Sequence, residues 1–211
     1  MSSRIVGRMV GVVVASAAVA GPAAAQYRAA QALQRPLNFE VGAGPSVPLG
    51  SADKALTTGF NVLAAASLHG RAFPVGLRGG VSYQRFGAKT GRVDPVTTIR
   101  SGSGQLSAAT LDATFGVPTG TFRPYVLAGV GYYDFRSRRS VSQIVGGDVI
   151  VVSTLRQSDA RLGFNAGLGM RGGLGALDAF VEVRLDDMRT EAGAFGSRRL
   201  QVVPVTLGFR F

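Results

Sequence analysis

Residues 203–211 read Val-Pro-Val-Thr-Leu-Gly-Phe-Arg-Phe, and this closing stretch decides the fold class. Its apolar side chains fall at every second position: Val203, Val205, Leu207, Phe209 and Phe211. The positions between them carry Thr206, Gly208 and Arg210, with Pro204 as the exception. Because successive side chains of a β-strand point to opposite faces, this alternation predicts a strand with one apolar and one polar face.

The same period of two recurs upstream of the closing stretch. It is clearest at 37–44, 75–83, 110–117, 162–171 and 181–186. Segment 60–68 alternates weakly because Leu63 and Ala65 interrupt its polar face, and segment 125–135 is apolar on both faces. By analogy with the glycines of 162–171, we expect Gly129 and Gly131 to point inward. Together these segments predict eight strands.

The links between the expected strands alternate in length. Three are short, at 70–73, 118–121 and 173–176, whereas the others are mostly longer, above all 87–103 and 137–158. Short links at one end and long links at the other are typical of outer-membrane barrels, whose short turns face the periplasm. We therefore expect an all-β, eight-stranded, antiparallel up-and-down barrel.

Charged residues fall within the expected strands, on the face opposite the apolar one: Glu40, Arg78, Asp112, Arg171, Glu182, Arg184, Asp186 and Arg210. Acids and bases are equal in number, as a closed and dry interior requires, because an unpaired buried charge costs several kcal/mol. We expect a salt-bridge network that fills a narrow interior. The alternative is a gating or conduction element built on Glu182 and Arg184.

The first residues carry an export pattern rather than a strand pattern. Arg4 and Arg8 precede an uncharged apolar run at 9–21, and three alanines at 23–25 offer a cleavage site. This indicates a signal peptide at 1–25, with an uncleaved anchor helix as the alternative. Residues 26–35 are expected to be a short disordered lead-in, and 36–211 the barrel.

Composition narrows the chemistry. The 211-residue chain has a net charge of +11 and no Cys, so neither a disulfide nor a thiolate metal site is possible. Its 23 basic residues are scattered rather than gathered into a patch, which disfavours nucleic-acid binding. The single histidine, His69, has no evident catalytic partner. Residues 167–172 match G-x-G-x-x-G, but no helix is expected after them, so no cofactor is expected.

Three motifs, in this order, resemble those of a known family. They are Pro-Tyr-Val-Leu-Ala-Gly-Val-Gly-Tyr-Tyr at 124–133, Phe-Val-Glu-Val-Arg at 180–184 and the last eight residues. The chain is similar to the outer-membrane β-barrel domain family of OmpA-like, OmpX-like and opacity-type porin-family small barrels. The resemblance implies that a terminal signal is read by the barrel assembly machinery. Its residues here would be Val205, Leu207, Phe209 and Phe211.

Arginines are expected in the outer links: Arg136, Arg138, Arg139, Arg198 and Arg199. Their guanidinium forks suit the phosphates of lipopolysaccharide, and ordinary solvated loop charge is the alternative.

We expect a non-enzymatic outer-membrane protein with a structural or surface-interaction role. A narrow porin or small-solute transporter and a soluble periplasmic lipocalin-like carrier are the alternatives. Ligand, oligomeric state and solute conduction stay open.

Overall fold

A computed structural model describes residues 37–69, 74–89, 91–92, 97–117, 120–145, 148–174, 177–190 and 199–211. The expected signal peptide and lead-in lie outside these residues. The strands are β1 (Leu37–Leu49), β2 (Gly59–His69), β3 (Val75–Gly87), β4 (Gly91–Arg92), β5 (Thr97–Gly116), β6 (Phe122–Val145), β7 (Asp148–Leu174), β8 (Leu177–Arg189) and β9 (Arg199–Arg210). One short helix, α2 (Ser51–Ala55), follows β1. No helix in the described ranges is long and apolar enough to cross a membrane.

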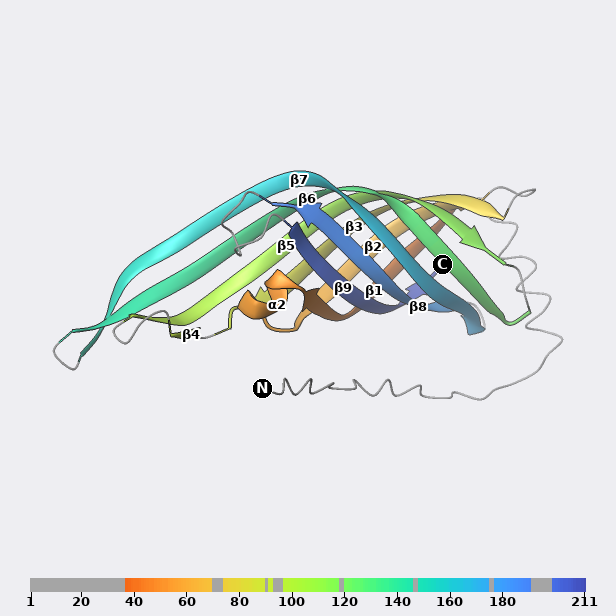
Figure 1. Cartoon of the computed structure of the whole chain (residues 1–211). Coiled ribbons are helices and arrows are strands. Elements are labelled where there is room, and N and C mark those ends of the chain that lie inside the picture. The colour runs from red at the N-terminus through yellow and green to blue at the C-terminus, as the bar shows by residue number, and fades with distance from the viewer. Residues whose placement is uncertain are drawn as a thin grey trace, which may run out of the picture.

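The strands close into a barrel. They pair in the order β3-β2-β1-β9-β8-β7-β6-β5, and β3 also pairs with β5. Every pairing between these strands is antiparallel. The two-residue β4 pairs only with the start of β5, outside this ring. The predicted closed eight-stranded antiparallel barrel is therefore confirmed (Figure 1).

The first and last long strands meet at a seam between β1 and β9. At one end of this seam, the Phe39 and Phe211 backbones exchange two hydrogen bonds of 2.8 and 3.0 Å. Further along the seam, Pro45 and Pro204 cannot donate to the ladder because proline has no backbone N–H. Asn61 of β2 reaches across: its Nδ2 donates to the carbonyl oxygens of Gly44, Pro45 and Val205 at 3.0, 2.9 and 3.2 Å.

Two of the expected long links are largely strand. Instead of leaving the sheet at 137–158, β6 runs to Val145 and β7 begins at Asp148, and the two strands pair up to their tip. Likewise, most of 97–103, inside the expected 87–103 link, belongs to β5 and pairs with β6. β5, β6 and β7 are therefore 20, 24 and 27 residues long and project well beyond the other strands (Figure 1). We call this projection the β5–β7 extension.

The two faces of the wall are opposite in character. Leu162, Phe164 and Leu207 are exposed on the outside, at 75%, 72% and 66% of their surface. Inward positions are buried and largely polar or charged. An added Cβ at Gly129 or Gly131 would meet the interior side chains of Asp112 or Tyr133, so both glycines face inward as expected.

The interior is apolar near α2. Ala52 and Leu56 are fully buried there and belong to one cluster with large side chains from the barrel wall: Phe86, Leu106, Tyr133, Phe135, Met188, Leu200 and Val202. The backbone of Leu56 forms a bridge to Ala88, and the amide of Thr57 donates to the Gly87 carbonyl at 2.8 Å. The connection between β1 and β2 is thus folded against the barrel and fills that part of the interior.

Candidate functional site

All eight charged residues expected inside the barrel are buried, each with less than a tenth of its surface exposed. They come from six strands: Glu40, Arg78, Asp112, Arg171, Glu182, Arg184, Asp186 and Arg210. We refer to these eight residues as the interior ion network. Their burial follows from strand parity, because each lies on the face of its strand opposite the outward-facing one.

Glu40 of β1 is the centre of the network. Its carboxylate oxygens lie 2.9 Å from Arg78 Nη2, 3.1 Å from Arg171 Nη2 and 3.8 Å from Arg210 Nε. The hydroxyl of Ser67 donates to the same carboxylate at 3.2 Å. One acid therefore lies close to cations from three different strands.

Arg78 links Glu40 to Glu182 of β8, the strand that faces β3 across the ring. Its Nη1 lies 2.8 Å from Glu182 Oε2, and the Tyr125 hydroxyl donates to the same oxygen at 2.7 Å. The guanidinium of Arg171 stacks over the Tyr125 ring, 4.0 Å from its centroid, which adds a cation–π contact. This chain of contacts spans the interior and leaves Glu182 paired with Arg78 rather than with Arg184.

A second group surrounds Asp186. Arg184 Nε lies 2.9 Å from its carboxylate, Gln84 donates to it at 2.8 Å, and the Tyr133 hydroxyl donates at 3.3 Å. Asp112 accepts a hydrogen bond of 3.3 Å from Thr110. Tyr133 also belongs to the apolar cluster beneath α2, so the polar and apolar parts of the interior are packed against each other.

One interior pair was missed in the sequence analysis. Arg123 of β6 and Asp178 of β8 form an ion pair of 2.7 Å in a largely buried setting. Both could have been found by parity: Asp178 shares the parity of Glu182, and Arg123 shares that of Gly129. The pair adds one acid and one base, so it preserves the charge balance.

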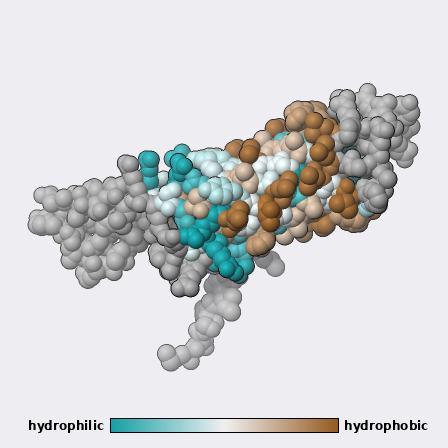
Figure 2. Space-filling view, turned by 90° about the horizontal axis from the view of Figure 1, so that it is seen from above, coloured by the Kyte–Doolittle hydropathy of each residue, from teal (hydrophilic) through white to brown (hydrophobic). Residues whose placement is uncertain are grey.

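The outer wall carries a continuous apolar surface, which we call the outer apolar band. Its members come from all eight long strands and include Phe39, Phe60, Leu77, Leu111, Phe115, Val126, Val130, Leu162, Phe164, Leu168, Val181, Leu207 and Phe209. On β6 the band runs from Phe122 to Tyr132, which at ~3.3 Å per residue and a tilt of ~40° spans about 25 Å along the barrel axis. The visible face in Figure 2 is brown over the band and teal beside it.

The arginines expected in outer links have different settings. Arg136 and Arg138 lie on β6, on the outer wall beyond the outer apolar band, and both are exposed. Arg199 donates hydrogen bonds to the Asp187 carboxylate, including two of 2.8 Å from its Nε. Arg198 and the Arg139 side chain lie outside the described part of the chain.

The remaining chemical candidates bring no further site. His69 is the last residue of β2, and its side chain is not among those described. Residues 167–172 lie within β7 and are followed by β8 rather than by a helix. Among described residues, no group of three or more metal-ligating side chains is close enough to hold a metal ion.

No protein-family model and no curated protein sequence matches the chain. Among solved structures, a major outer membrane protein from Thermus thermophilus aligns with a TM-score of 0.56 at 15% identity, covering 84% of this chain and 99% of that one. Neisserial surface protein A aligns with a TM-score of 0.53 at 17% identity, covering 83% and 96%. Ail of Yersinia pestis, solved with the heparin analogue sucrose octasulfate, aligns with a TM-score of 0.45 at 13% identity, covering 83% and 97%.

The first two likenesses, together with the closed ring of strands, define the class of protein. The chain has the fold of the small eight-stranded outer-membrane β-barrels. At these identities the likeness is one of fold, so the role has to be argued from the wall and the interior.

Proposed function

We propose that this chain is a non-enzymatic β-barrel of the bacterial outer membrane with a structural or surface-interaction role. The observation that carries the proposal is the inverted wall, which is apolar outside and ion-paired inside. A surface of this size and apolarity is costly in water but matches the hydrocarbon core of a bilayer.

The inverted wall also argues against a soluble lipocalin-like carrier. Such a barrel places its apolar face inward to hold a ligand and its polar face in water. Here Glu40, Arg78 and Glu182 occupy the inside, while Phe164 and Leu207 are mostly exposed outside. At the level of the interior ion network, the described charged residues form ion pairs with one another.

A narrow porin is less well supported than a structural barrel. The contacts from Glu40 through Arg78 to Glu182 cross the interior, and the apolar cluster beneath α2 fills it further along. The interior of an eight-stranded barrel is narrow enough for its own side chains to fill. Because the interior ion network and the apolar cluster beneath α2 fill successive parts of the interior, they favour a barrel that does not conduct solutes.

The proposal implies partners in biogenesis and in the membrane. We propose that the chain is exported by its N-terminal segment, assembled by the barrel assembly machinery through Val205, Leu207, Phe209 and Phe211, and surrounded by lipid and lipopolysaccharide. Strand parity supports this assignment, because all four residues lie on the outer wall.

The test combines partitioning and conductance of the purified full chain. We expect it to enter the detergent phase in cloud-point extraction, to migrate differently on gels before and after boiling, and to give no steady channel openings in planar bilayers. Retention in the aqueous phase would overturn the membrane assignment. Steady nanosiemens-scale openings would overturn the structural role in favour of a porin.

A further inference from the structure

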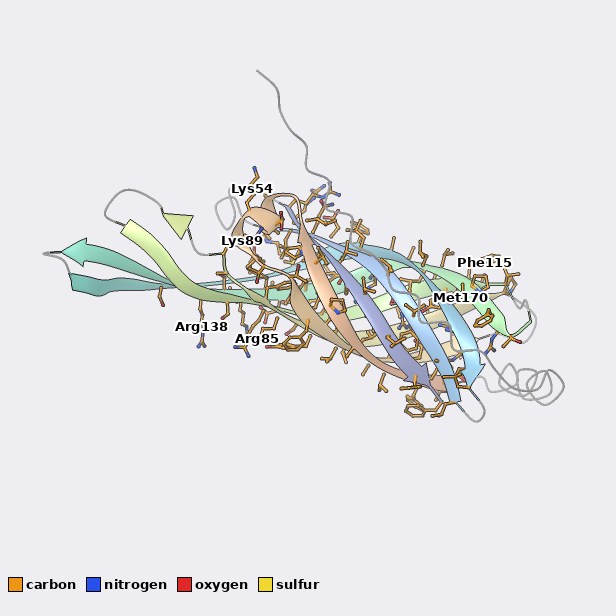
Figure 3. The ribbon with its side chains drawn as sticks, turned by 90° about the horizontal axis from the view of Figure 1, so that it is seen from below. Lys54, Arg85, Lys89, Phe115, Arg138 and Met170 are labelled. Atoms are coloured by element: carbon orange, nitrogen blue, oxygen red, sulfur yellow. The ribbon has the colours of Figure 1, made fainter. Side chains whose placement is uncertain are left out.

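Three arginines gather on the outer wall where the outer apolar band ends at the β5–β7 extension. Arg85 of β3 pairs in register with Gln105 of β5, which in turn pairs with Arg136 of β6. Arg138 lies two residues further along β6, opposite Ser103. We call Arg85, Arg136 and Arg138 the outer arginine cluster. Figure 3 shows Arg85 and Arg138 projecting outward on one side of the ribbon, with Lys54 on the other.

The cluster carries surplus positive charge. Asp134 is the acid beside it, and its carboxylate lies 2.7 Å from Arg136 Nη2. Arg85 and Arg138 are exposed, and no ion pair joins either of them to another described residue. Adjacent strands are ~4.8 Å apart, so Arg85 and Arg136, two strands apart, stand about 10 Å from each other.

An aromatic and apolar surface lies directly below these cations. Tyr83 is the next outward residue of β3 after Arg85, and Tyr132 is the next outward residue of β6 after Asp134. The Phe60 and Tyr83 rings are 6.3 Å apart. Aromatic rings of this kind gather at the interface between lipid and water. The arginines therefore lie where the headgroup of an anionic lipid would be, and the apolar surface lies where its acyl chains would be.

We infer that the outer arginine cluster is a binding site for the phosphate groups of a phosphorylated glycolipid, lipopolysaccharide, in the outer leaflet. The inference rests on the proposed outer-membrane function. It places the lipopolysaccharide contact on the strands of the outer wall rather than in the outer links. Arg85 and Arg138 supply guanidinium forks, which hold phosphate oxygens in pairs. Gln105 and the hydroxyl of Ser107 face the same side and add neutral hydrogen-bonding groups.

The spacing favours a headgroup with more than one phosphate. A glycerophospholipid offers one phosphate and meets one arginine, whereas a glycolipid with phosphates on separate sugars meets two across β5. A soluble anion gains the charge contacts alone, because it has no chains to lie on Tyr132 and the outer apolar band. These differences make the choice of lipid measurable.

The test measures binding of fluorescent rough lipopolysaccharide to the full chain folded in detergent micelles, with phosphatidylglycerol and inorganic pyrophosphate as competitors. One variant carries Arg85→Gln and Arg138→Gln, and its matched control carries Lys54→Gln and Arg189→Gln, which remove the same charge elsewhere on the exposed surface. We expect the first to bind about tenfold more weakly and the control to bind as the parent does.

A third variant, Arg85→Lys and Arg138→Lys, keeps the charge and removes the forks, and it is expected to bind with intermediate affinity. Equal loss in cluster and control variants, no loss in either, or competition by pyrophosphate as strong as by unlabelled lipopolysaccharide would each overturn the inference. Heat-dependent gel migration is followed in parallel. If the parent chain shows no heat-dependent migration, the proposed membrane barrel itself is overturned. If the chain folds but shows no preference among the lipids, only the proposed lipopolysaccharide site is overturned.

Discussion

A single carboxylate is shared by three guanidinium groups inside this barrel. Glu40 is almost completely buried, and its neighbours Arg78, Arg171 and Arg210 lose their common partner if it is neutralised. Removing one partner of a buried ion pair is more damaging than never having had the pair, because the charge left behind is no longer solvated.

We therefore expect Glu40→Gln to lower the free energy of unfolding by roughly 3–5 kcal/mol. Urea unfolding of the barrel in lipid vesicles, followed by tyrosine fluorescence, measures this. The control is Asp53→Asn, which breaks the exposed pair with Lys89 and should cost less than about 1 kcal/mol. Equal effects of the two changes would contradict the assignment of Glu40 as the centre of the network.

Gly169 is a residue where the absence of a side chain is needed. A Cβ added there would lie 2.5 Å from Cζ of Tyr125. The hydroxyl of this tyrosine donates to Glu182, and its ring stacks under Arg171. We expect Gly169→Ala to destabilise the barrel by about 1–3 kcal/mol, since overpacking displaces the ring. The same unfolding assay on Gly79→Ala serves as control, because a Cβ at Gly79 meets nothing within 4 Å. An unchanged free energy of unfolding for Gly169→Ala would show that the Tyr125 ring can move freely.

Parity could predict which charges are inside, but it could not predict their partners. Glu182 and Arg184 lie on one face of β8, yet Glu182 pairs with Arg78 across the ring, whereas Arg184 pairs with Asp186 of its own strand. The choice depends on which strands face each other across the ring, and on how far each side chain reaches. The alternation within one strand predicts neither which strands face each other nor how far a side chain reaches.

At the scale of elements, the strands with one buried face were the predictable ones. β8 and β9 alternate because one face meets the interior and the other is exposed. The β5–β7 extension has no such pattern: residues 149–152 are four consecutive β-branched residues, which favour extended backbone without marking a face. Helix α2 was missed because five residues are too few to show a helical period.

The β5–β7 extension should be dispensable for the barrel. Replacing 140–154 with Asn-Gly joins Arg139 to Leu155, which are already paired, through a favoured two-residue hairpin turn. We expect the shortened chain to keep its heat-dependent gel migration and its urea midpoint, because the interior ion network and the cluster beneath α2 lie outside the deleted segment. A barrel that no longer refolds would show that the extension takes part in closure.

At the scale of the whole molecule, Phe211 contributes to the seam that closes the ring. Phe211 exchanges two backbone hydrogen bonds with Phe39, and their rings lie 6.3 Å apart. We expect deletion of Phe211 to reduce the amount of barrel in outer-membrane fractions severalfold. Affinity for lipopolysaccharide of the fraction that folds should stay as it was, since the outer arginine cluster is remote in the strand register. Normal membrane levels of the truncated chain would contradict the proposal that Phe211 is part of an assembly signal.

The side chain of Asn61 couples three strands rather than two. It lies on β2, yet its amide group bonds to backbone carbonyls of both β1 and β9, and its Oδ1 accepts from the Thr206 hydroxyl at 2.8 Å. These bonds cannot all exist until β9 has arrived beside a β1 that is already backed by β2. The full set of bonds therefore requires the two ends of the sheet to be joined, and an open ring would leave the Asn61 side chain without its β9 partners.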